Sequence, residues 1–203
     1  MYLLRYLFGH RFLQSLREAR ETEQTIRTGG KAFTEKCPPA MIAHFTINLS
    51  VMQSVPNPVP FLMAFFLLML GCIANLHFFF TALSLFSVPT GATLMFISII
   101  PLVIYLTGSF ALINKGFLYG LYNYAFFLIG NFIFSCVLLI MLWKNGDYHN
   151  VGQIAFTIVL VLLCRWIING DTYNMMIRFV LARRLVRVAH KKYSTSIVKK
   201  GSR

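Results

Sequence analysis

The long middle part of the chain carries almost no charge. Between residues 37 and 164, the only charged side chains are Lys115, Lys144 and Asp147. Over the whole chain 57% of the residues are hydrophobic and 12% are charged, whereas a soluble domain carries about 25% charged residues. So little charge cannot cover the surface of a water-soluble protein of this size. The sequence therefore predicts an integral membrane protein.

Apolar stretches in this middle part reach about 20 residues, the length of helix that crosses a bilayer. Short breaks rich in proline, glycine, asparagine and lysine separate them. The four predicted spans cover residues 59–84, 92–113, 119–143 and 152–169. We expect an all-α, polytopic membrane protein with four transmembrane helices and amphipathic cytoplasmic helices at both ends. Two spans, with the other segments as interfacial or re-entrant hairpins, are the alternative.

Basic residues gather at the two ends of the chain, whose net charge is +13. Residues 1–36 hold seven basic and four acidic side chains, and residues 165–203 hold ten basic and one acidic. Cytoplasmic segments of membrane proteins are enriched in Lys and Arg, so we expect a multi-pass membrane protein with both termini in the cytoplasm. We do not expect nucleic acid as a partner, because no base-reading fold accompanies the basic tail.

The chain then divides into three predicted parts: a cytoplasmic or interfacial arm (1–56), a transmembrane region (57–169) and a basic cytoplasmic helix and tail (170–203). Leucine and tyrosine recur between residues 3 and 16 with arginines between them, which predicts an amphipathic helix at the membrane surface that Gly29 and Gly30 end. This helix either only orients the first span or forms a docking surface for a partner. Residues 41–55 predict a second interfacial or half-inserted helix.

Polar side chains inside the predicted spans are candidates for function, because their burial in lipid is costly. We single out Asn75, His77 and Asn131. His77 either titrates in a proton path or is a hydrogen-bonded packing residue, and Asn131 is typical of contacts between helices. The first three spans contain no carboxylate, which argues against an ion-coupled carrier.

Arg165, Asp171 and Arg178 lie where the fourth span should end. In one interpretation the span ends near residue 169 and Arg165 extends to the cytoplasmic headgroups. In the other the helix continues, and Asp171 and Arg178, seven residues apart, share one face within the protein. Beyond them we expect Arg183, Arg184, Arg187 and Lys191 on one helix face, where they would attract anionic lipid headgroups.

The motifs of enzymes and metal sites are missing from this sequence. It has no GxSxG, HExxH, phosphate-binding loop or dinucleotide-binding pattern, and its four cysteines lack CxxC spacing. We therefore expect neither catalytic residues nor a cofactor nor a metal site, and we interpret the protein as non-enzymatic.

Several short patches resemble a known family. They comprise Leu16-Arg17-Glu18-Ala19-Arg20, Ile26-Arg27, Ala32-Phe33-Thr34, Leu162-Leu163-Cys164-Arg165, Met175-Met176-Ile177-Arg178 and Arg183-Arg184. Together they resemble the small inner-membrane accessory subunits of Dot/Icm-like (type IVB) secretion and conjugation systems, of the IcmV/TraX type. The resemblance implies an accessory protein of the bacterial inner membrane, beside a large polytopic partner and without chemistry of its own.

Two classes of function follow from these observations. The favoured one is a non-enzymatic subunit or regulator of a bacterial membrane assembly of the conjugation or type IV secretion, exclusion or immunity type, bound to a larger polytopic protein or to copies of itself. The alternative is a small oligomeric channel or transporter, in which Asn75, His77, Asn131 and Arg165 line a path.

Overall fold

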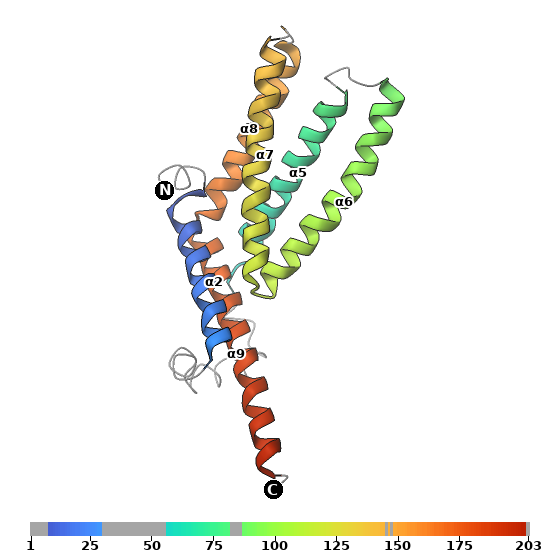
Figure 1. Ribbon diagram of the computed structural model, residues 1–203. Helices are drawn as coiled ribbons and strands as arrows, with labels where there is room; N and C mark the ends of the chain where they lie inside the picture. The colour runs from blue at the N-terminus through green and yellow to red at the C-terminus, as the bar shows by residue number, and fades with distance from the viewer. Residues whose placement is uncertain (1–7, 30–55, 82–86, 145, 147, 202–203) are drawn as a thin grey trace.

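The computed structural model describes residues 8–29, 56–81, 87–144, 146 and 148–201, and this part of the chain contains helices and no strands. The helices, labelled as in Figure 1, are α2 (His10–Thr28), α5 (Val59–Thr81), α6 (Val88–Asn114), α7 (Leu118–Lys144), α8 (Tyr148–Ile168) and α9 (Asp171–Gly201). The prediction of an all-α protein is confirmed. The predicted helix at 41–55 lies outside the described residues.

Four of these helices, α5 to α8, are long and apolar enough to cross a membrane. The prediction of a multi-pass membrane protein with four spans is therefore confirmed. Helix α6 begins at Val88, four residues before the predicted start, because Ser87 and Pro89 form a favourable first turn.

A short turn joins α6 to α7 and lies against α9. Gly116 adopts a φ of 79° in the turn between α6 and α7, a conformation that favours glycine. A side chain there would also meet the main-chain oxygen of Val180 in α9, because a Cβ atom on Gly116 would lie 2.9 Å from it. The hairpin of α6 and α7 can therefore touch α9 only with glycine at this position.

Helices α5, α7 and α8 pack closely together (Figure 1). Helix α6 lies close to α7 at the turn that joins them, and its other end leans away from the bundle (Figure 1). In the most apolar 18-residue stretch of α6, 17% of the residues are buried, whereas 33% are buried in the corresponding stretch of each of the other three spans. Helix α6 therefore offers most of its length to its surroundings.

Helix α2 packs beside the first half of α9, at the end of the bundle where α8 ends (Figure 1). We call this the α9 end. Phe12 of α2 is fully buried there and packs against Tyr124 of α7 and Tyr173 of α9. The buried side of the N-terminal helix thus meets the rest of the chain, and this contact goes beyond the membrane-surface helix expected from the sequence.

Candidate functional site

A cluster of four polar side chains lies buried between three of the spans. It comprises Asn75 of α5, Asn131 and Ser135 of α7, and Thr157 of α8, and we call it the polar cluster. Two of its members, Asn75 and Asn131, were predicted as candidates, and the structure brings them together.

Asn75 is the centre of the polar cluster. Its Nδ2 lies 2.6 Å from Asn131 Oδ1 and 2.7 Å from Ser135 Oγ, and donates to both acceptors. Its Oδ1 accepts a hydrogen bond of 3.3 Å from Thr157 Oγ1. One asparagine side chain therefore links α5 to both α7 and α8 by neutral hydrogen bonds, the form of polar contact that lipid-embedded helices use.

Because Gly71, one turn before Asn75, has no side chain, the Asn131 amide can pack against α5 there. A Cβ atom on Gly71 would lie 2.7 Å from Asn131 Nδ2. This nitrogen is buried and has no hydrogen-bond partner in the structure. The cluster is therefore tightly enclosed, with the amide packed directly against the backbone of α5.

A second buried contact joins the same three helices nearer the α9 end. Tyr124 Oη of α7 donates to the main-chain oxygen of Ala64 in α5 at 2.9 Å, and lies 2.9 Å from Cys164 Sγ of α8. Between this contact and the polar cluster, the buried side chains are apolar: Leu68, Leu128 and Val161. The interior of the bundle is thus filled between the two polar contacts.

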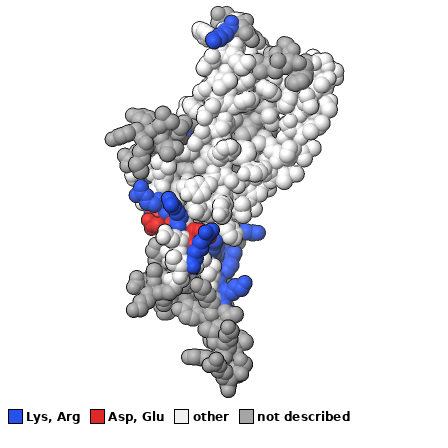
Figure 2. All heavy atoms as spheres, in the orientation of Figure 1, with Lys and Arg blue, Asp and Glu red and all other residues white. Residues whose placement is uncertain are grey.

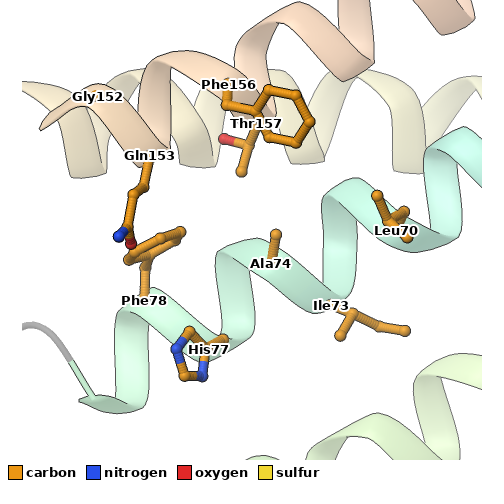
Figure 3. A pocket seen from close by; sticks show the side chains of 9 residues that line it. All are labelled: Leu70, Ile73, Ala74, His77, Phe78, Gly152, Gln153, Phe156 and Thr157. Atoms are coloured by element: carbon orange, nitrogen blue, oxygen red, sulfur yellow. The ribbon is translucent and has the colours of Figure 1, made fainter. Parts of the chain in front are cut away.

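His77, another predicted candidate, lies apart from the polar cluster. It lines a groove between α5 and α8, with a volume of about 560 Å³, together with Gln153 and the apolar residues Leu70, Ile73 and Phe156 (Figure 3). The His77 side chain is exposed in the structure, and its ring and that of Phe78 are in a T-shaped arrangement. Thr157 contributes both to this groove and to the polar cluster.

At the α9 end, α2 and α9 run in parallel and are joined by pairs of polar side chains. The two members of each pair are separated by a nearly constant number of residues along the chain. Ser15 Oγ donates to Asn174 Oδ1 at 2.6 Å, and Arg178 Nη2 lies 2.7 Å from Glu18 Oε1. An ion pair between Arg11 and Asp171 lies one turn earlier. Partners are thus separated by 159 or 160 residues along the chain, as expected for two helices side by side in the same direction.

The last pair in this series is the most protected. Arg184 Nη1 lies 2.6 Å from Glu23 Oε2, and the two side chains are only 11% and 15% exposed. Arg184 also donates to the main-chain oxygen of Gly116 at 3.0 Å and lies over the ring of Phe117. Burial opposes ionisation of Glu23, but the hydrogen bond and charge of Arg184, with Arg27, outweigh it and hold the pKa of Glu23 below its usual value.

Arg184 therefore differs in position from the other basic residues of the predicted lipid-binding face. Arg183, Arg187 and Lys191 are exposed, whereas Arg184 points to α2 and to the turn between α6 and α7. One helix position separates Arg183 from Arg184 by about 100° around the axis, which places them on different sides of α9. Lys and Arg atoms gather around α2 and α9, below the uncharged surface of the spans (Figure 2).

The structure combines features of the two interpretations of Arg165, Asp171 and Arg178. Helix α8 ends at Ile168 and α9 begins at Asp171, so the helix is interrupted as in the first interpretation. Asp171 and Arg178 nevertheless face the same neighbour, because both pair with α2. Arg165 is half-buried, and its Nε has no hydrogen-bond partner in the structure.

Asn169, in the break between α8 and α9, holds the start of α2. Its Nδ2 donates to the main-chain oxygen of Phe8 at 2.6 Å. A Cβ atom on Gly9 would lie 2.1 Å from Asn169 Oδ1, and Gly9 also has a φ of 78°. Only glycine fits at this position, which gives the N-terminal helix a fixed starting point.

Sequence reasoning missed Ser135, Thr157, Glu18 and Glu23. Serine and threonine are common inside membrane helices because they can bond to the backbone of their own turn, as Ser135 does to Asn131 and Thr157 does to Ile154. Their spacing therefore carries no signal of a shared cluster. The charges of Glu18 and Glu23 were visible, but their partners lie 160 and 161 residues away.

Among the described residues, no three His, Cys, Asp or Glu side chains lie close enough together to hold a metal ion. The arrangement offers hydrogen bonds between helices, a half-open groove and a charged surface. Comparison with family models, with curated proteins and with solved structures gives no match for the chain.

Proposed function

We propose that this protein is a non-enzymatic subunit or regulator of a multi-protein assembly in the bacterial inner membrane, of the conjugation or type IV secretion, exclusion or immunity type. Both termini would lie in the cytoplasm, and the partner would be a larger polytopic membrane protein. The accessory subunits of type IVB systems, which the sequence resembles, are one such class.

The observation that carries the proposal is the joining of α2 and α9 into one surface fixed to the spans. Ion pairs hold the two helices in parallel, and Asn169 and Arg184 tie them to α8 and to the turn between α6 and α7. Arg17 and Arg20 of α2 and Arg183 and Arg187 of α9 remain exposed on this surface. A rigid, charged surface at one membrane face suits recognition of a partner, with anionic lipid headgroups beside it.

The same charges support the proposed orientation. The α9 end carries the exposed arginines, while Lys144 at the end of α7 lies at the opposite end of the bundle. Positive residues near the ends of spans are retained in the cytoplasm. Reporter fusions after residues 115 and 203 should therefore report the cytoplasm, and a fusion after residue 88 should report the other compartment.

The channel alternative has weaker support, because the candidate polar residues do not share a path within one chain. Asn75 and Asn131 bond to each other, His77 lines the groove, and apolar side chains fill the interior from the polar cluster toward Arg165. The contacts of Asn75 resemble those that hold helices together rather than those that pass an ion.

Purification from its own membrane followed by native mass spectrometry tests the proposal, with ion flux measured in liposomes that contain the purified protein. We expect a complex with a different polypeptide and no flux above that of protein-free liposomes. A defined homo-oligomer that conducts ions would overturn the proposal, above all if His77→Ala abolished conduction and His10→Ala, at an exposed histidine of α2, preserved it.

A further inference from the structure

The groove between α5 and α8 is polar at one end and mainly apolar along the rest of its length (Figure 3). His77 and Gln153 lie at one end of it, and Leu70, Ile73 and Phe156 lie further along (Figure 3). His77 is four residues before the end of α5, and Gln153 is five residues after the start of α8. At about 1.5 Å per residue, these polar side chains lie within one or two turns of the ends of α5 and α8 opposite the α9 end.

We propose that this groove binds one phospholipid from the leaflet opposite the α9 end, with an acyl chain along Leu70, Ile73 and Phe156 and the phosphate near Gln153 and His77. The polarity of the groove matches the orientation that such a lipid already has in the bilayer, polar outside and apolar inside. The inference does not depend on the proposed function.

The length of the groove favours a lipid over a helix of another protein. From Leu70 to Phe78 the α5 wall of the groove rises about 12 Å, at about 1.5 Å per residue. The hydrocarbon core is about 30 Å thick, so the groove covers the depth of one leaflet and not that of the whole bilayer. A transmembrane helix would need a contact surface along most of the core.

The chemistry at the polar end fits a phosphodiester. The Gln153 amide carries N–H donors, the His77 imidazole adds a donor, and a phosphodiester offers only acceptor oxygens. The cavity volume of about 560 Å³ lies within the range of about 300–1,000 Å³ found for small-molecule sites. Gly152, which also lines the groove, leaves its wall open, since a Cβ atom there would meet nothing within 4 Å.

A photoactivatable lipid tests the proposal. The purified chain is placed in nanodiscs of phosphatidylethanolamine and phosphatidylglycerol that contain a small fraction of phospholipid with a diazirine on its acyl chain. After illumination, the labelled residues are mapped by mass spectrometry. We expect labelling at Ile73 and Phe156 several-fold above that at Ile100 and Ile104, which are exposed on α6 outside the groove.

Two leucine substitutions give the matched comparison. Gly152→Leu fills the groove, and we expect labelling at Ile73 and Phe156 to fall to the level of α6. Gly130→Leu adds the same side chain at an exposed glycine of α7 that also has nothing within 4 Å, and should leave the labelling unchanged. Equal labelling of groove and α6 in the wild type, unchanged labelling in Gly152→Leu, or cross-links between two copies at the groove would each overturn the proposal.

Discussion

Polar side chains join helices in two regions of this molecule, by neutral hydrogen bonds in one region and mainly by ion pairs in the other. In the polar cluster, Asn75 connects three spans with neutral groups that are all buried. Between α2 and α9 the polar contacts are mostly ion pairs, and their exposure varies from Asp171, which is 77% exposed, to Arg184, which is 11% exposed.

The difference follows from the surroundings of each region. A charge inside the hydrocarbon core is costly, whereas a neutral hydrogen bond between helices avoids that cost. Near water, ionised side chains keep part of their hydration and pair at little cost. We therefore expect the polar cluster to determine the stability of the bundle, and the ion pairs to determine how firmly α2 is held on α9.

The largest effect is expected at the centre of the polar cluster. Asn75→Leu removes a donor and an acceptor and leaves Asn131, Ser135 and Thr157 without their shared partner. At about 1–3 kcal/mol for a buried polar group left unsatisfied, we expect the free energy of unfolding in mixed micelles to fall by about 2–3 kcal/mol. Asn114→Leu makes the same change at the exposed end of α6 and should have little effect. Equal losses in the two variants would mean that the polar cluster does not hold the spans together.

A smaller effect is expected at the most protected ion pair. Glu23→Gln leaves the guanidinium of Arg184 half-satisfied in a site where it is only 11% exposed. We expect α2 to open from α9 more easily by about 1–2 kcal/mol, measured by amide hydrogen exchange of α2 peptides, with exchange in α7 unchanged. A double-mutant cycle with Arg184→Gln isolates the coupling, and a coupling near zero would contradict the pairing.

Acid should weaken the same contact. Because the pKa of Glu23 in the folded protein lies below its usual value of 4.5, its contribution is fully present above about pH 5 and is lost as the pH falls through the lowered pKa. After the measured rates are corrected for the intrinsic pH dependence of amide exchange, the opening of α2 should therefore increase below that pH more in the wild type than in Glu23→Gln. The same acid response in both proteins would assign the effect to other groups.

The smallest effect is expected at the outermost ion pair. Asp171→Asn removes the partner of Arg11, but both side chains are more than half exposed, and exposed pairs contribute about 0–1 kcal/mol. Exchange in α2 should change little, and the change should vanish at high salt because salt screens exposed charges. A loss as large as that of Glu23→Gln would remove the distinction between protected and exposed pairs.

Much of the fold could be predicted from the sequence, because a nearly uncharged middle part and its turn residues define four spans whose starts lie within four residues of those in the structure. A helix that ends at Gly29 was also predicted, and the break near residue 169 was one of the two interpretations that the sequence left open. The contacts between distant segments were not. No local sequence pattern indicates that Glu23 pairs with Arg184 or that Thr157 bonds to Asn75. These contacts form only when the spans pack together and α9 lies beside α2.

The candidate site shows the same limit. Asn75 and Asn131 could be selected because asparagine is costly in lipid, but their meeting and the separate position of His77 depend on helix rotation. Likewise, Arg184 belongs to a run of basic residues in the sequence, and only the packing of α2 and the α6–α7 turn distinguishes it from Arg183.

We propose that the surface formed by α2 and α9 recognises a partner at the membrane. Native mass spectrometry of complexes extracted from the membrane tests it most directly, comparing the wild type with Arg17→Glu/Arg20→Glu and with Lys144→Glu at the opposite end of the bundle. We predict a different polypeptide bound to the wild type and to Lys144→Glu, and its loss from the double variant. Equal retention of the partner in all three proteins, or no partner in any of them, would contradict the claim.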